Sequence, residues 1–387
     1  MWLQEKPASG IARKLRRSRE WVHKWIRRYR NAGKTWFLDC SKRPHRITRR
    51  VSDSFERLVI RIHAKLKGKE NPLGFYGAEA IYNELTDLGI RPLHSIRTIH
   101  RILSRHQLLT RKRRDRSRKG PILPCPTARR QNDVHQLDFI VGHYLASRRP
   151  VVILNRKDMA TGLVCGTEGP DRRVQRVLAF LQTDWQRHGI PRFLQMDNDM
   201  SLTGGRMHGR SLGQLVRFCL ACRVIPVFTP ERRPASNALV ERYNGLWQEK
   251  VWQRYRFRTL GQLWTRSQAF QEAYNAYLKR RLSRQGKSAL FVARLRYLPK
   301  TIRLIHPLPL CRGQIWFIRR VDEEGCIQVL NESLGLSKRY AHEFVRVVVR
   351  TGPQSLSIYW RTSERGKFKR IAHRTYKLRE KARTPFF

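Results

Sequence analysis

The sequence predicts a multidomain protein with N-terminal all-α helix-turn-helix units, a central α/β domain built on a mixed sheet, and a small C-terminal β-barrel. Apolar residues recur every three to four positions up to about residue 109, which is the helical period. From about residue 131, strand-like runs alternate with amphipathic helices, and short β-rich runs follow between residues 315 and 361. A chain of 387 residues, of which 40% are hydrophobic, can form several cores of this kind.

The net charge indicates the kind of partner. The chain contains 81 Lys and Arg against 29 Asp and Glu, which gives a formal net charge of +52. Such an excess is typical of nucleic-acid-binding proteins, because basic side chains bind phosphates and release their counterions. A ribosomal-type or membrane-surface protein is the alternative, and the long apolar segments with aromatic residues disfavour it.

We expect a cytoplasmic protein with no membrane association. No apolar run approaches the roughly 18 residues that span a membrane, and residues 1–20 are too polar for a signal peptide. The 7 cysteines are scattered, as is typical of a reducing compartment. Cys219 and Cys222 have C-x-x-C spacing, but their apolar neighbours indicate a helix core rather than a zinc site.

Residues 1–50 are predicted to form a first helix-turn-helix domain. A short helix carries Ile11, Ala12 and Leu15, and Ser18 caps a second helix that begins at Arg19. The inner face of that second helix consists of Val22, Trp25, Ile26 and Tyr29. Its basic outer face, which is expected to enter the major groove, consists of Arg19, His23, Lys24, Arg27 and Arg28. A helical hairpin with no DNA function is the alternative for this pattern taken alone.

Residues 51–115 repeat this arrangement as a second helix-turn-helix domain. A helix over residues 52–66 precedes a helix pair that is broken at Gly89, and Ser95 caps the last helix. The candidate DNA contacts of this region are Arg97, Arg101, Arg111, Lys112, Arg113 and Arg114. A basic, Pro-containing linker is expected over residues 116–130. Two such units in tandem strengthen the DNA-binding interpretation, because linked modules raise affinity together.

Residues 131–290 are predicted to form the central α/β domain. A meander of three strands is expected over residues 135–144, 151–155 and 161–168. Helices and strands then alternate over residues 172–187, 192–197, 212–222 and 224–229, and a long helix begins near Asn237. After a further helix over 264–280, the short β-rich runs predict a small barrel over residues 305–362. Residues 363–387 are expected to be a partly disordered basic tail.

Three carboxylates are the candidate catalytic residues. Asp138 lies within a strand, Asp197 ends a strand, and Glu241 lies near the start of a helix. Each acid alone is better explained as a helix cap or a surface ion pair, but the three in this order, on these elements and in so basic a chain, favour a common site. On a phosphate-binding surface, however, carboxylates repel the ligand unless a cation lies between them, and oxygen ligands select Mg²⁺ or Mn²⁺. Two such ions could activate water or a 3′-hydroxyl and stabilise the leaving oxygen of a phosphodiester.

The order and the flanking residues of these acids carry a resemblance. The last acid lies in PASNALVERYNG, where Pro234, Asn237, Val240, Glu241, Arg242, Asn244 and Gly245 match the pattern P-x-x-N-x-x-V-E-R-x-N-G. With HQLDFIV and FLQMDND before it, this stretch resembles the integrase core of DDE transposases and retroviral integrases. It is most similar to bacterial insertion-sequence transposases that begin with a helix-turn-helix pair.

The resemblance implies a function and a site. It implies a ribonuclease H-like core in which Asp138 bridges two Mg²⁺ ions while Asp197 and Glu241 each hold one. It implies hydrolysis at transposon ends, strand transfer into target DNA, a homo-oligomer, and no small-molecule substrate. The protein would then be a nucleoid-associated protein of a bacterium, and Arg242 and Asn244 would contact DNA.

Some features depart from the family pattern. The interval from Asp197 to Glu241 is longer than in most members and includes the Gly-rich stretch SLTGGRMHGRSLG. Asp199 replaces the usual small residue after D-N and is a competing ligand, although Asp197 directly follows the strand. A DNA-binding protein that no longer cuts and represses its element is the alternative function. A metal-dependent nuclease or an RNA-binding protein is disfavoured by the tandem helix-turn-helix units.

Overall fold

The computed structural model describes residues 6–31, 33–38, 51–109, 121–199, 202, 210–231, 234–291, 295–301, 307–363 and 366–386. The chain divides into two compact units, Met1–Leu58 and Val59–Phe387. The basic run of Arg111, Lys112, Arg113 and Arg114 lies outside the described residues, as does most of the Gly-rich insert. Within the described part of the chain, no helix is long and apolar enough to cross a membrane.

The first unit begins with two helices joined by a tight turn. They are α1 (Ala8–Leu15) and α2 (Arg19–Asn31), followed by the 3₁₀ helix η2 (Gly33–Thr35). The Oγ atom of Ser18 accepts a hydrogen bond of 3.1 Å from the backbone N–H of Trp21, which is the predicted cap. Ile11, Ala12 and Val22 form a small buried core.

The rest of the predicted inner face of the first unit is less buried than expected. Leu15 is 44% exposed and Tyr29 is 41% exposed. Trp36, which follows η2, packs against Trp25 and Tyr29 with ring centres 6.0 and 5.5 Å apart. Two short helices and this one side chain shield the face only in part. The helix pair is therefore as predicted, whereas its role in DNA binding remains a prediction.

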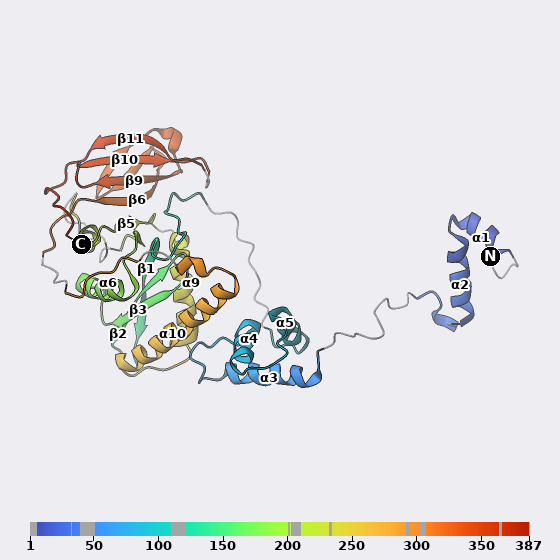
Figure 1. Cartoon of the computed structure of the whole chain (residues 1–387). Helices are drawn as coiled ribbons and strands as arrows, with labels where there is room; N and C mark the ends of the chain where they lie inside the picture. Colours follow the sequence, from blue (N-terminus) through green and yellow to red (C-terminus); the bar gives the residue numbers. More distant parts are fainter. Residues whose placement is uncertain are drawn as a thin grey trace. The chain divides into compact units, whose positions relative to one another are not determined.

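Three helices precede the central domain (Figure 1). They are α3 (Asp53–Lys67), within which the two units meet, α4 (Ala78–Asp87) and α5 (Ile96–Arg105). The Oγ atom of Ser95 accepts a hydrogen bond of 3.2 Å from the N–H of Thr98, so the predicted cap of α5 is present. The residues buried on α4 and α5 include Ile81, Leu85, Ile99, Ile102 and Leu103.

The central sheet starts as an antiparallel meander and continues with parallel strands. The strands are β1 (Val134–Tyr144), β2 (Pro150–Asp158), β3 (Val164–Gly169), β4 (Phe193–Met196) and β5 (Ile225–Phe228). The order β1–β2–β3 is antiparallel, β4 pairs parallel with β1, and β5 pairs parallel with β4. This mixed sheet confirms the predicted α/β class of the central region.

Helices cover both faces of this sheet. The helices are α6 (Val174–His188), α8 (Gln214–Ala221), η3 (Pro234–Asn237), α9 (Ala238–Trp247), the π-helical η4 (Gln248–Trp252), α10 (Leu260–Arg284) and η5 (Ser288–Phe291). One core joins Leu137 of β1 to α6 and α8, and the other joins Ile140 of β1 to α9 and α10. Because successive strand residues point to opposite faces, Asp138 lies on the side that α9 covers.

Of the six C-terminal strands in the described residues, four extend the central sheet and two pair only with each other, which differs from the predicted barrel. The six strands are β6 (Gln314–Arg320), β7 (Cys326–Val329), β8 (Glu332–Gly335), β9 (Phe344–Arg350), β10 (Ser355–Trp360) and β11 (Lys369–Thr375), with the 3₁₀ helix η6 (Lys338–Tyr340). The sheet order is β11-β10-β9-β6-β5-β4-β1-β2-β3, so β6 pairs with the core strand β5. A separate barrel would need these strands to close on themselves; instead, β6 pairs with the open edge of β5.

Candidate active site

Asp138 and Asp197 stand on neighbouring parallel strands. The register of β1 and β4 aligns Gln136 with Gln195. Each aspartate lies two residues after the glutamine of its strand. Because side chains alternate between the two faces, both aspartates lie on the same side of the sheet as the glutamines. Asp138 is half-buried within β1, whereas Asp197 is exposed directly after the last residue of β4.

Buried amide side chains fix the start of α9, the helix that carries Glu241. Gln136 accepts a hydrogen bond from the N–H of Val240 (3.1 Å), and Gln195 donates to the carbonyl of Ser236 (2.8 Å). Asn237 donates to the carbonyl of Leu137 on β1 (3.2 Å). Because unpaired buried amides are costly, this network holds the first turn of α9 against both aspartate-bearing strands.

The sequence analysis missed Gln136 and Gln195 as parts of the site. Gln136 is 2% exposed and Gln195 is 1% exposed. The signal was present in HQLD and LQMD, where a glutamine precedes each aspartate by two positions on its strand. A polar residue at that position of a buried strand indicates a partner in the fold, here the start of α9.

Asn244 holds Asp138, a role that the sequence did not suggest, and its DNA contact stays a prediction. Its Nδ2 atom donates to Oδ2 of Asp138 (2.8 Å), and its Oδ1 atom accepts from Nδ2 of Asn155 on β2 (2.8 Å). Asn244 is 7% exposed and Asn155 is fully buried. Because Asn155 orients the amide, Asn244 presents its N–H to the carboxylate and fixes the rotamer of Asp138.

The three acids share one electrostatic environment. Burial raises the pKa of Asp138 to about 7, and the negative charges of Asp197 and Glu241 add to this rise. Burial and the charge of Asp197 raise the pKa of Glu241, while partial loss of hydration raises the pKa of Asp197. None of the three forms an ion pair with a basic residue in the described part of the chain. Their charges are therefore uncompensated by contact.

Asp199 is engaged elsewhere, which favours Asp197 as the acid of this loop. Oδ2 of Asp199 accepts a hydrogen bond of 2.6 Å from Nη1 of Arg172. The backbone N–H of Asp199 donates to Oδ1 of Asp197 (3.1 Å) and so helps to orient that carboxylate. The arginine contact already neutralises Asp199.

Comparison with known proteins gives similarity to solved structures only. No model of a protein family matches the chain, and no curated protein matches it. The dimeric, magnesium-bound catalytic core of HTLV-2 integrase is 16% identical, covers 31% of this chain and 68% of its own, and has a TM-score of 0.25. An intasome of simian T-cell lymphotropic virus is 14% identical over 84% of this chain and 99% of its own, with a TM-score of 0.31. The catalytic core of BIV integrase is 15% identical over 40% of this chain and 99% of its own, with a TM-score of 0.29. Identities and TM-scores this low do not assign an activity to the chain.

The chemistry of the acidic cluster fits a hard divalent cation. Asp138, Asp197 and Glu241 offer only carboxylate oxygens, which Mg²⁺ and Mn²⁺ prefer. Their mutual repulsion in a chain of net charge +52 leaves negative charge that a bound cation would neutralise. The carboxylate oxygens of Asp138, Asp197 and Glu241 do not all lie within 4.8 Å of one another. Among the described residues, only Cys165, Asp184 and His188 meet this condition.

In the cluster of Cys165, Asp184 and His188, Asp184 belongs to a buried ion pair with Arg156. The cluster is therefore not a metal site. Nε of Arg156 donates to Oδ2 of Asp184 (2.9 Å), and Nδ1 of His188 lies 2.9 Å from Oδ1 of the same carboxylate. The guanidinium already supplies the positive charge that a metal would bring. Burial raises the pKa of the Cys165 thiol to about 12, so it does not offer a thiolate.

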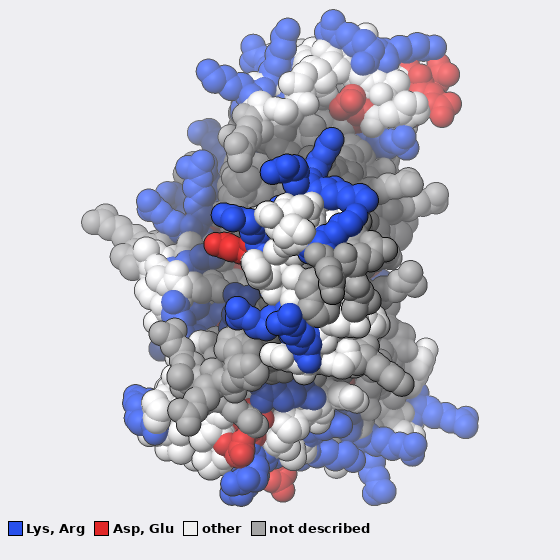
Figure 2. All heavy atoms as spheres, turned by 90° about the vertical axis from the view of Figure 1, so that its right-hand side faces the viewer, with Lys and Arg blue, Asp and Glu red and all other residues white. Residues whose placement is uncertain are grey.

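The basic residues that the sequence singled out lie mainly on the surface. On α2, Arg19, His23, Lys24 and Arg27 are exposed, as are Arg97 and Arg101 on α5 and Arg242 on α9. Arg28 differs, because it is half-buried and its guanidinium lies 4.8 Å from the ring centre of Trp25. Figure 2 shows one face of the molecule, on which Lys and Arg side chains predominate over acidic ones.

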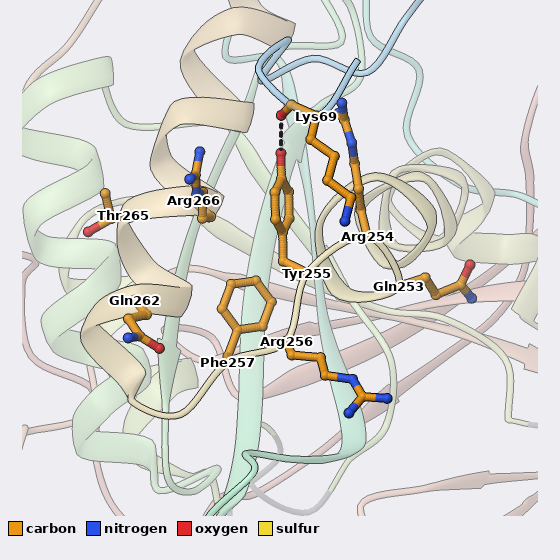
Figure 3. A pocket seen from close by; sticks show the side chains of 9 residues that line it. All are labelled: Lys69, Gln253, Arg254, Tyr255, Arg256, Phe257, Gln262, Thr265 and Arg266. Carbon is orange, nitrogen blue, oxygen red and sulfur yellow. Dashed lines mark hydrogen bonds between the residues drawn. The ribbon is translucent and has the colours of Figure 1, made fainter. Parts of the chain in front are cut away.

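A basic pocket that the sequence analysis did not identify lies between α10 and the loop that joins α3 to α4. Its volume is about 970 Å³, and it is lined by Lys69, Gln253, Arg254, Tyr255, Arg256, Phe257, Gln262, Thr265 and Arg266 (Figure 3). The hydroxyl of Tyr255 donates to the carbonyl of Lys69 (2.7 Å), and Nη1 of Arg254 donates to the carbonyl of Asn71 (2.7 Å). No acidic residue lines the pocket, so its charge favours a phosphate-bearing ligand.

Proposed function

We propose that this chain is a metal-dependent polynucleotidyl transferase that cuts double-stranded DNA at the ends of a mobile element and joins those ends to target DNA. One observation carries the proposal: three electrostatically coupled carboxylates, none of them in an ion pair within the described residues, lie on one side of a sheet in a chain of net charge +52. A structural cluster would pair such acids with arginines, as Asp184 is paired with Arg156. No such pairing of the three acids occurs in the described part of the chain, which supports a role in binding a cation.

In this proposal each acid has a role in binding two Mg²⁺ or Mn²⁺ ions. Asp138, Asp197 and Glu241 would together hold these ions through their carboxylate oxygens. The bound ions would supply an activated water or 3′-hydroxyl and would stabilise the leaving oxygen. Asn244 fixes the Asp138 carboxylate, and the amides of Gln136, Gln195 and Asn237 fix the elements that carry the other acids.

The basic surfaces would hold the DNA around this site. Arg242 is exposed next to Glu241 on α9, where it can contact the phosphate backbone. The helix-turn-helix regions over residues 1–50 and 51–115, with the basic run that follows them, would bind the element ends. Pairing two ends requires a homo-oligomer.

The first test compares the two aspartates of the D-N-D loop. Asp197→Asn is expected to reduce Mg²⁺-dependent cleavage of DNA carrying the element ends by at least ~100-fold, because it removes a ligand. Asp199→Asn, a matched change two residues away, is expected to retain most activity. The measurement is cleavage of labelled end-containing DNA with Mg²⁺ and with a chelator. Equal cleavage by the wild type and Asp197→Asn would refute the site, and cleavage that survives chelation would refute the metal mechanism.

One observation favours the alternative of a DNA-binding repressor that no longer cuts. The carboxylate oxygens of the three acids do not all lie within 4.8 Å of one another. A repressor would bind the element ends with the same salt dependence but would show no Mg²⁺-dependent cleavage in the assay above. End binding without cleavage by the wild type would select this function.

A separate test addresses the basic pocket. Arg256→Ala is expected to weaken DNA binding and to reduce the slope of log affinity against log salt by about 0.9, since one phosphate contact is lost. Arg256 is exposed and forms no ion pair among the described residues. Arg187→Ala, an equal change on α6 across the sheet, is the control. Fluorescence anisotropy from about 50 to 200 mM salt measures both slopes. Equal slopes for the two variants would exclude a specific role of the pocket.

A further inference from the structure

Asn198, which follows the candidate ligand Asp197, is hydrogen-bonded to the C-terminal part of the sheet. Its Oδ1 atom accepts a hydrogen bond of 2.9 Å from Nη2 of Arg319 on β6. Its Nδ2 atom donates to the carbonyl of Thr229, which follows β5. The asparagine side chain therefore connects the loop after β4 to β5 and to the strand that begins the C-terminal region.

The guanidinium of Arg319 is held by oxygen atoms from several elements. Its Nε atom donates to the carbonyl of Gln328 on β7 (2.8 Å), and Nη1 donates to the carbonyls of Ile318 (3.0 Å) and Thr229 (3.4 Å). The guanidinium also lies 5.0 Å from the ring centre of Phe317. Its acceptors are carbonyl and amide oxygens, and no carboxylate forms an ion pair with it within the described residues. Such a fork of donors fixes geometry, because each of its three nitrogens donates to at least one acceptor.

The loop that carries Asp197 needs such a support. Asp197 follows the last residue of β4, so the strand pairing no longer holds its backbone. Its carboxylate accepts a hydrogen bond from the N–H of Asp199, which belongs to the same loop. The charges of Asp138 and Glu241 repel it. Within the described residues, Asn198 links this loop to Thr229 and to Arg319 on β6, and Asp199 links it to Arg172.

We infer that Arg319 is a positioning residue of the active site: through Asn198 it holds the loop of Asp197 where that carboxylate can share a metal with Asp138. The C-terminal strands are then a structural part of the active site and do not form a separate DNA-binding module. The inference rests on the proposed function, because it assigns Asp197 to a metal. Arg319 itself touches neither metal nor DNA in this role.

The experiment measures metal binding without DNA in the full-length protein. Mn²⁺ binding is followed by calorimetry for the wild type, Arg319→Met and Arg320→Met. Arg320 is the matched control, since it is the next residue on β6, is exposed, and contacts His342 instead of Asn198. We expect Arg319→Met to weaken Mn²⁺ binding by ~10-fold or more, as is usual when the support of a metal ligand is lost. Arg320→Met is expected to bind Mn²⁺ as the wild type does.

A second variant separates positioning from folding. Asn198→Ala breaks the same link from the loop side and leaves the contacts of Arg319 within β6 and β7 in place. We expect it to weaken Mn²⁺ binding to a similar extent, and the double variant to be no weaker than either single one, because all three lack one shared link. Circular dichroism and the melting temperature check that each variant is folded.

The outcomes distinguish this inference from the proposed function. No Mn²⁺ binding by the wild type would overturn the proposed metal mechanism, and the inference with it. Wild-type binding that is unchanged in folded Arg319→Met or in Asn198→Ala would overturn the inference alone. Equal losses in Arg319→Met and Arg320→Met, or additive losses in the double variant, would also overturn it, since the effect would then not pass through the link.

Discussion

Replacing Asp138 by Asn is expected to abolish metal-dependent cleavage while making the metal-free protein more stable at neutral pH. The loss of cleavage, ~10³-fold or more, would follow from the proposed role of this carboxylate as a metal ligand. The gain in stability follows from the cluster itself, because burial and the charges of Asp197 and Glu241 oppose ionisation of Asp138 in the fold. An amide removes the charge and keeps the shape.

The pH dependence of this gain has a definite sign. The pKa of Asp138 rises from 3.8 to about 7 on folding, so the folded protein holds this proton more tightly than the unfolded chain. The wild type therefore loses stability as the pH rises from about 4 through 7, and Asp138→Asn does not. One pKa unit corresponds to about 1.4 kcal/mol, so the gain of Asp138→Asn in free energy of unfolding is at most about 4 kcal/mol. Because solvent and structural relaxation screen a half-buried group, we expect about 1–3 kcal/mol at pH 8 and almost none at pH 4.

Thermal unfolding with a chelator at both pH values measures this difference. Glu323→Gln, an equal change in charge at an exposed turn, is the control and should leave the melting temperature unchanged. If the wild type binds Mg²⁺ at the three acids, adding Mg²⁺ should stabilise it and not Asp138→Asn. A melting temperature of Asp138→Asn at pH 8 that is equal to or below that of the wild type would contradict the repulsion.

Local sequence patterns predicted most of the elements and the three acids. Helical periodicity and caps such as Ser18 and Ser95 are properties of neighbouring residues, and both caps are present in the structure. The strands that were missed, β8 and β11, contain few apolar residues; β11 reads KRIAHRT. An edge strand needs little apolar surface, because basic side chains protect its open edge from pairing with other chains.

Long-range pairing could not be predicted in this way. The junction of β5 and β6 joins residues near 227 to residues near 316, and no local pattern encodes which strand edge is open. The same limit explains Asn244, which the resemblance placed among the DNA contacts and whose partners lie far away in the sequence, on β1 and β2. Within the site, the residue types were readable from the sequence, but the assignment of each polar side chain to a ligand or to a support was not.

Breaking the buried pair of Arg156 and Asp184 is expected to be the most destabilising single change among those considered. The side chains are 3% and 0% exposed, and Nε of Arg156 donates to Oδ2 of Asp184 (2.9 Å). Asp184→Asn would leave a buried guanidinium without its counter-charge, a loss that costs about 3–5 kcal/mol. The measurement is the free energy of unfolding at pH 7 from denaturant titration of the second unit, Val59–Phe387.

The cost of Asp184→Asn should itself depend on pH. Although burial opposes ionisation, the charge of Arg156 and the hydrogen bonds to His188 and Arg156 lower the pKa of Asp184 far below its ordinary value. Its carboxylate thus contributes stability above the unfolded pKa of about 3.9, and this contribution is lost as the pH falls further. The difference between the wild type and Asp184→Asn should be largest near neutral pH and should shrink below about pH 4.

A double variant shows whether the pair stabilises the fold or only avoids a penalty. Arg156→Met combined with Asp184→Leu replaces both charges by apolar side chains on β2 and α6, where Leu154 and Leu181 already pack. Because two desolvation costs disappear with the attraction, we expect the double variant to be within about 1–2 kcal/mol of the wild type. A double variant as unstable as Asp184→Asn would show that the ion pair itself, and not merely its neutrality, holds α6 on the sheet. That face lies across the sheet from Asp138, so neither variant should change Mn²⁺ binding in the folded protein.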